Sequence, residues 1–73
     1  MTHSNLTPVS SSNLDALGYD DTDSTMYAQF KGGAVYAYQG VPKDIYELVL
    51  NANSVGRALN EHVKNVYNYV RVS

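Results

Sequence analysis

Cysteine is absent from this 73-residue sequence. Neither a disulfide nor a zinc site with thiolate ligands can therefore stabilise the fold, and the redox compartment stays open. Apolar runs are short, and none approaches the roughly 18 residues that a membrane-spanning helix requires. The N-terminal residues MTHSNL also lack the basic region and apolar run of a signal peptide. We therefore expect a soluble, cytoplasmic protein with no membrane partner.

Charged residues are scarce, at 16% of the chain, and the formal net charge is −2. Proteins that bind duplex DNA without sequence preference neutralise many phosphates, so this composition argues against that function. The two halves differ: one lysine and four aspartates precede Lys43, whereas four basic and three acidic residues occupy the chain from Lys43 onward. An anion-binding site is therefore expected in the second half.

The length of the chain permits a single domain with a small core, and oligomerisation would add to its stability. Residues 1–8 are polar and aperiodic, which predicts a disordered N-terminal tail. Residues 9–73 are expected to form the domain.

A β-hairpin between residues 25 and 39 is the clearest element of secondary structure. Residues 25–30, TMYAQF, place Met26, Ala28 and Phe30 on one side of a strand, as a half-buried strand requires. A glycine pair follows and leads into a second strand over residues 34–39. A short first strand over residues 14–19 is expected before the hairpin, with the turn sequence DDTDS between them.

The length of the hairpin loop decides where Tyr36 and Tyr38 point. A three-residue loop over residues 31–33, with Gly33 in a bulge, puts both tyrosines on the core side with Phe30. A two-residue loop puts them on the opposite side of the sheet, where they would form an open aromatic platform. Spacing alone leaves both registers open.

Two short helices are predicted after the hairpin. Pro42 suits a first helical turn, and Ile45, Leu48, Val49 and Ala52 follow as one apolar stripe. Ser54 is a favourable N-cap for a second helix. That helix would turn an apolar stripe inward: Val55, Leu59, Val63 and, at its end, Val66.

Residues 67–72, YNYVRV, alternate and allow a final strand. The expected fold class is therefore α+β, with a small antiparallel sheet packed against two short helices.

Several motifs in this order resemble the KTSC domain, a family named after the C-terminal extension of some lysyl-tRNA synthetases and found also as stand-alone bacterial and phage proteins. The motifs are VSSSN at 9–13, GYD at 18–20, YAY at 36–38, VP at 41–42, NANSVGRALNEHV at 51–63 and YNYVRV at 67–72.

This resemblance implies no assigned activity, although RNA binding has been suggested for the family. Its members often carry a basic residue between the two central tyrosines, where this chain has Ala37. The departure disfavours phosphate contact by the strand. A polar residue at that position in relatives favours the register in which Tyr36 and Tyr38 point inward and residue 37 points outward.

The best candidate for an anion site is the start of the second helix. Ser54, Gly56, Arg57 and Asn60 would gather there, with Gly56 leaving room for a phosphate and Arg57 clamping it. The alternative is structural: Ser54 caps the helix, Gly56 permits tight packing and the polar side chains form a solvated face. Lys64 lies on the same side of this helix at four-residue spacing from Asn60.

A second feature that could bind a ligand is the set of seven tyrosines. Tyr36 and Tyr38 are the two that we expect to contact it. Tyrosine stacks on bases in single-stranded nucleic acids and nucleotides. It also fills the core or dimer interface of a small protein without tryptophan.

Catalytic and metal sites are not supported by the sequence. Asp20, Asp21 and Asp23 lack the spacing of a calcium loop, so a plain turn is the better interpretation. His62 has no partner residue that would make it a general base. We therefore expect a non-enzyme without cofactor or metal.

Two functions from different classes remain. The first is a binding module for a phosphate-bearing ligand, either single-stranded RNA or a nucleotide; one variant is a phage protein that sequesters a host nucleotide signal. The alternative is a structural or protein-interaction domain that forms homo-oligomers without nucleic acid.

Overall fold

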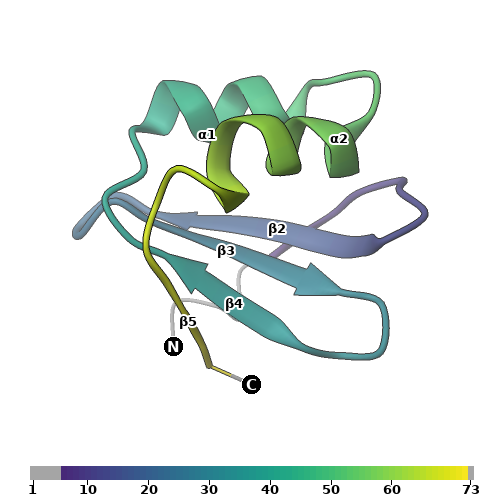
Figure 1. Ribbon diagram of the computed structural model, residues 1–73, viewed down its shortest axis with the longest axis horizontal. Helices are drawn as coiled ribbons and strands as arrows, with labels where there is room; N and C mark the ends of the chain where they lie inside the picture. Colours follow the sequence, from purple (N-terminus) through teal and green to yellow (C-terminus); the bar gives the residue numbers. More distant parts are fainter. Residues whose placement is uncertain (1–5, 73) are drawn as a thin grey trace.

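The computed structural model describes residues 6–72, which form one antiparallel sheet with helices across one face (Figure 1). The strand order is β1-β2-β3-β4-β5. The elements are β1 Thr7–Pro8, β2 Leu14–Asp20, β3 Thr25–Phe30, β4 Val35–Tyr38, α1 Lys43–Leu50, α2 Val55–Leu59, the π-helical turn η2 Asn60–Lys64 and β5 Tyr69–Arg71. The expected α+β class is confirmed.

The N-terminal boundary differs from the sequence prediction. Thr7 and Pro8, assigned to a disordered tail, form the edge strand β1 opposite Leu17 and Ala16 of β2. The Leu6 side chain lies against β2, because a Cβ atom added to Gly18 of that strand would meet it at 2.6 Å. The polar composition of residues 1–8 gave no signal for this short edge strand. The rest of the expected tail, residues 1–5, lies outside the described residues.

The hairpin adopts the three-residue loop. The Phe30 amide donates to the Ala34 carbonyl at 2.8 Å, and the Gly33 amide donates back to the Phe30 carbonyl at 3.0 Å. Gly32 and Gly33 both have φ +99°, a conformation that L side chains disfavour. Phe30 therefore stands opposite Ala34, and the core-facing register of Tyr36 and Tyr38 is confirmed.

The core lies between the helices and the sheet. It is formed by Leu14, Leu17, Met26, Ala28 and Tyr38 from the strands and by Val49, Val55, Leu59 and Val63 from the helical segments. The apolar stripe expected in α2 and η2 is thus buried at four-residue spacing. Ser54 caps this segment as predicted, since its hydroxyl accepts from the Arg57 amide at 3.4 Å.

Two residues expected in the core are exposed. Leu48, 47% exposed, flanks the stripe through which α1 meets the core, where Val49 is fully buried. Val66, 62% exposed, follows the end of η2 at Lys64, so it no longer belongs to the helical stripe. Both predictions were wrong because the actual contact stripe is narrower and shorter than the apolar pattern.

The final strand β5 is present and pairs with β4. Tyr69 stands opposite Tyr38, and Arg71 stands opposite Tyr36. Side chains opposite each other in a sheet share a face, so Tyr69 lies on the side of the sheet that carries the helices. Tyr69 remains 53% exposed.

Candidate functional site

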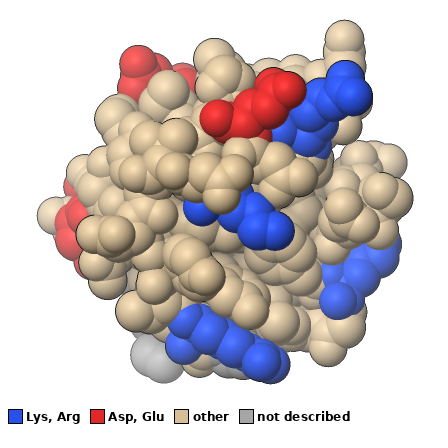
Figure 2. All heavy atoms as spheres, in the orientation of Figure 1, with Lys and Arg blue, Asp and Glu red and all other residues tan. Residues whose placement is uncertain are grey.

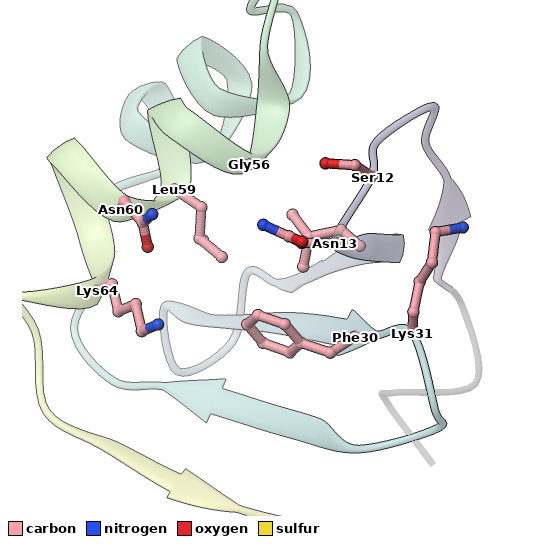
Figure 3. Close-up of a pocket in the computed structure, with 9 residues that line it drawn as sticks. Ser12, Asn13, Phe30, Lys31, Gly56, Leu59, Asn60 and Lys64 are labelled. Atoms are coloured by element: carbon pink, nitrogen blue, oxygen red, sulfur yellow. The ribbon is translucent and has the colours of Figure 1, made fainter.

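Three adjoining hollows form a groove between the α2–η2 segment and the sheet. The middle hollow, about 350 Å³, lies between Asn60 and Lys64 of the helical segment and Asn13 and Phe30 of the sheet side (Figure 3). It shares Phe30 and Lys64 with a second hollow over β4 and β5 of about 290 Å³. It shares Ser12, Asn13, Gly56 and Asn60 with a third hollow of about 400 Å³. We call these three adjoining hollows together the groove.

The third hollow is the polar end of the groove. Its walls include Ser11, Ser12, Asn53, Ser54, Arg57 and Asn60. Arg57 is the one charged side chain among the described residues that line it. Hydroxyl, amide and guanidinium groups can together bind a phosphate or the hydroxyls of a sugar. The four residues predicted at the start of the second helix, Ser54, Gly56, Arg57 and Asn60, are thus brought together here.

Of the two roles expected for Gly56, its surroundings agree with tight packing. A Cβ atom added to it would lie 3.2 Å from the Ser11 hydroxyl oxygen. Gly56 therefore allows the Ser11 loop, rather than a phosphate, to approach the helix. The Arg57 amide is already bonded to Ser54, and α2 has only five residues, so the ligand-binding groups of the polar end are its side chains.

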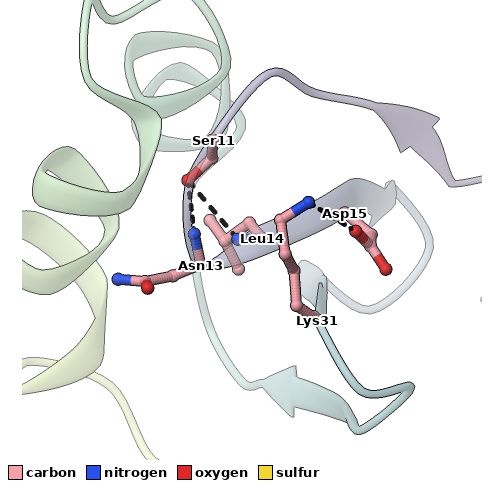
Figure 4. A network of polar contacts seen from close by, with 5 residues as sticks. All are labelled: Ser11, Asn13, Leu14, Asp15 and Lys31. Carbon is pink, nitrogen blue, oxygen red and sulfur yellow. Dashed lines mark hydrogen bonds and ion pairs between the residues drawn. The ribbon is translucent and has the colours of Figure 1, made fainter.

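The loop before β2 is held in place by Ser11. Its hydroxyl accepts from the amides of Asn13 at 3.2 Å and Leu14 at 3.4 Å (Figure 4). On the far side of β2, Lys31 lies 3.2 Å from the carboxylate of Asp15. Lys31 lines the middle hollow, but this ion pair offsets its charge.

The second hollow is an aromatic cleft lined by Phe30, Ala34, Tyr36, Tyr38, Lys64 and Tyr69. The Tyr36 ring lies 5.5 Å from the rings of both Phe30 and Tyr69, measured between centroids. Tyr38 lies 5.6 Å from Tyr69. Tyr36 and Tyr38 therefore contribute both to the core side of the sheet and to the wall of the cleft.

Burial raises the pKa of the Tyr38 hydroxyl above its ordinary value of 10.0, and the neighbouring Tyr69 and Tyr36 add to the shift. The hydroxyl group is therefore neutral at physiological pH. It can donate a hydrogen bond into the aromatic cleft.

Positive charge is spread along the groove. Figure 2 shows Lys and Arg side chains over the centre, right and lower parts of one face, with one acidic side chain directly against the uppermost of them and others at the upper left and left. No described acidic residue lines any of the three hollows. Within residues 6–72, no carboxylate pairs with Arg57 or Lys64. The groove is therefore a favourable place for an anion.

The model of the KTSC domain family matches residues 10–69. The chain belongs to the KTSC domain family. It is 42% identical over 57 residues to a protein from Tsukamurella paurometabola, covering 78% of this chain and 85% of that protein. It is 38% identical over 63 residues to an uncharacterised protein from Stutzerimonas stutzeri, covering 85% of this chain and 89% of the relative.

A crystal structure of a KTSC domain protein from Yersinia pestis has the same fold, with a TM-score of 0.88 and 30% sequence identity. The alignment covers 94% of this chain and 97% of that one. Strand order and helix placement in this KTSC domain are therefore those of a known family structure.

Several groove residues were not among the site residues of the sequence analysis, and those that matter for ligand binding are Phe30, Lys64 and Tyr69. Asn60 and Lys64 bracket the π-helical turn η2, and such turns are frequent at functional sites. The four-residue spacing of Asn60 and Lys64 was the available signal for Lys64. Tyr69 could be found through its register with Tyr38, once the final strand is paired with β4.

The aspartates of residues 20–23 form a turn in this KTSC domain, as expected. Asp20 accepts hydrogen bonds from the Thr22 hydroxyl at 2.6 Å and from the Thr22 amide at 3.0 Å. These bonds hold the pKa of the Asp20 carboxyl below its ordinary value. Asp21 lies 3.7 Å from Lys43.

The described residues contain no group of three or more His, Cys, Asp or Glu side chains that could hold a metal ion. None of their helices has the length and apolar character to cross a membrane.

Proposed function

We propose that this KTSC domain is a non-enzymatic binding module for a ligand that combines a phosphate with a flat ring, either single-stranded RNA or a nucleotide. The observation that supports the proposal is the composition of the groove. Arg57 and Lys64 line it, neither is in an ion pair with a carboxylate of the described residues, and the groove ends on the exposed ring of Tyr69.

The two ends of the groove suit the two parts of such a ligand. An unpaired cation attracts a phosphate more strongly than one already engaged by a carboxylate. Aromatic side chains at the other end offer a face to a base, and stacking on such a ring contributes roughly 1–3 kcal/mol per base. The groove offers hydrogen-bond donors and aromatic rings, which bind a ligand without reacting with it. We therefore propose binding without turnover.

Binding of nucleotides and short RNAs by the wild-type chain tests this proposal. We expect a rise in melting temperature, because a ligand that binds only the folded state stabilises it. The affinity should fall as salt increases. Tyr69→Ala should reduce the binding free energy by about 1–3 kcal/mol, as measured by isothermal titration calorimetry.

Tyr69→Phe is the matched control, since it keeps the ring and removes only the hydroxyl. It should bind the same nucleotides and RNAs with about the affinity of the wild type. If no nucleotide or RNA in the panel alters the melting curve, the proposed function is wrong.

A second candidate function is homo-oligomerisation through the edge of the sheet. Of the five exposed large hydrophobic residues in the described chain, four lie near the C-terminus: Val66, Tyr69, Val70 and Val72. An edge strand with exposed apolar side chains favours pairing with another chain. The partner in this alternative is a second copy of this domain, paired along β5.

Val70→Lys tests this alternative, because a charge on the edge strand opposes pairing with another copy. We expect sedimentation analysis to find a larger species for the wild type and a folded monomer for Val70→Lys. Leu48→Lys removes a similarly exposed apolar side chain from α1 and should leave the assembly unchanged. A monomeric wild type would contradict the alternative.

A further inference from the structure

We infer that the ligand of the groove is a single strand of RNA at least two nucleotides long, with one base in the aromatic cleft and its backbone running along α2 and η2 toward Arg57. This inference rests on the proposed function and narrows it. The structural reason is that Lys64 and Arg57, neither of which is in an ion pair within the described chain, line different ends of the groove, with the middle hollow between them.

Lys64 and Arg57 serve different parts of the groove. Lys64 lines the aromatic cleft and the middle hollow, whereas Arg57 lines only the polar end. Seven residues of helical chain separate them, which corresponds to roughly 10 Å along the helical segment. A nucleotide with its base in the cleft can place its phosphate at Lys64. A contact with Arg57 then requires a second phosphate farther along the strand.

The middle hollow, whose lining residues are drawn in Figure 3, adjoins both of these positions. It shares Phe30 and Lys64 with the aromatic cleft, and Ser12, Asn13, Gly56 and Asn60 with the polar end. A strand that extends from the aromatic cleft to the polar end would pass these shared residues. A mononucleotide would leave the polar end empty.

The polar end favours RNA over DNA. Its walls are rich in hydroxyl and amide groups, including those of Ser12, Asn53 and Asn60. Such groups both donate and accept hydrogen bonds. The ribose 2′-hydroxyl, which DNA lacks, is a matching partner and is the group by which proteins distinguish the two nucleic acids.

The test compares oligoadenylates and oligouridylates of one, two, three and six nucleotides, each with a 5′-phosphate, by calorimetric titration of the full chain. Affinity should rise about tenfold or more from one nucleotide to three as the second phosphate reaches Arg57. It should then change little up to six. Deoxyribose versions of the three-nucleotide strands should bind several-fold more weakly.

Arg57→Ala provides the decisive variant. It should weaken binding of the three-nucleotide strand about tenfold while leaving the mononucleotide within about twofold of wild type. Lys43→Ala removes an equal charge from α1, outside the groove, and is the matched control. Circular dichroism verifies that both variants are folded.

The outcomes separate this inference from the proposed function. If mononucleotides bind as tightly as three-nucleotide strands, or if Arg57→Ala weakens both equally, the inference that the ligand is a strand is overturned. The proposed nucleotide-binding function then stands. Equal binding of the deoxyribose strands overturns the assignment to RNA. If neither mononucleotides nor strands bind, both proposals fall.

Discussion

Replacing Tyr38 by alanine is expected to leave this domain largely unfolded. Tyr38 is 1% exposed and is the largest fully buried side chain of the described residues. It packs in the core and contacts the Tyr69 ring. Truncating a buried aromatic residue costs about 3–5 kcal/mol, and a core of this size supplies little more than that in total. Urea denaturation followed by circular dichroism measures the loss.

Tyr38→Phe is the control for that substitution. It keeps the buried ring and removes only the hydroxyl, so the phenylalanine variant should fold with nearly wild-type stability. A phenylalanine variant as unstable as the alanine variant would show that the hydroxyl, and not the ring, carries the stability.

Alkaline pH gives an independent check on the same residue. The pKa of Tyr38 is raised in the folded state above the ordinary value of 10.0, so the folded chain holds this proton more tightly than the unfolded chain. Its contribution is fully present below pH 10.0 and is lost as the pH rises through the folded-state pKa. Tyr38→Phe should therefore lose less stability in this range than the wild type.

The fold was largely predictable because its signals are local. Residues 25–30 alternate cleanly, and the glycine pair at positions 32 and 33 supplies the positive φ angles of the turn. The choice between two hairpin registers was not determined by spacing, since a shift of one residue reverses both tyrosines. In the structure, the hydrogen bond from the Phe30 amide to the Ala34 carbonyl shows which register is adopted.

The candidate site was predictable only at one end. Ser54, Arg57 and Asn60 lie on one helical segment, so their proximity follows from sequence spacing. The proximity to Tyr36 does not, because it depends on Phe30 and Lys64, which line both the aromatic cleft and the middle hollow but come from segments far apart in the chain. Its prediction requires the position of η2 relative to β3, which no local pattern contains.

Reversing the charge of Lys64 is expected to have the largest effect on ligand binding. Lys64 lines both the aromatic cleft and the middle hollow, so any ligand with its ring in the cleft and its phosphate in the groove passes this side chain. Lys64→Glu replaces attraction by repulsion at that point. A hydrogen bond to a charged group is worth about 1.5–3 kcal/mol, so RNA affinity should fall at least tenfold.

Lys43→Glu is the matched control for net charge, because both substitutions change the charge of the chain equally. Lys43 lies on α1 outside the groove, and its exposed contact with Asp21 at 3.7 Å contributes little to stability. Both variants should keep the wild-type circular dichroism spectrum, and Lys43→Glu should bind RNA within about threefold of wild type. If the two variants lose equal affinity, attraction is governed by the overall charge of the protein and the groove is not the binding site. Loss confined to Lys64→Glu assigns the phosphate contact to η2, where the helical segment meets the aromatic cleft.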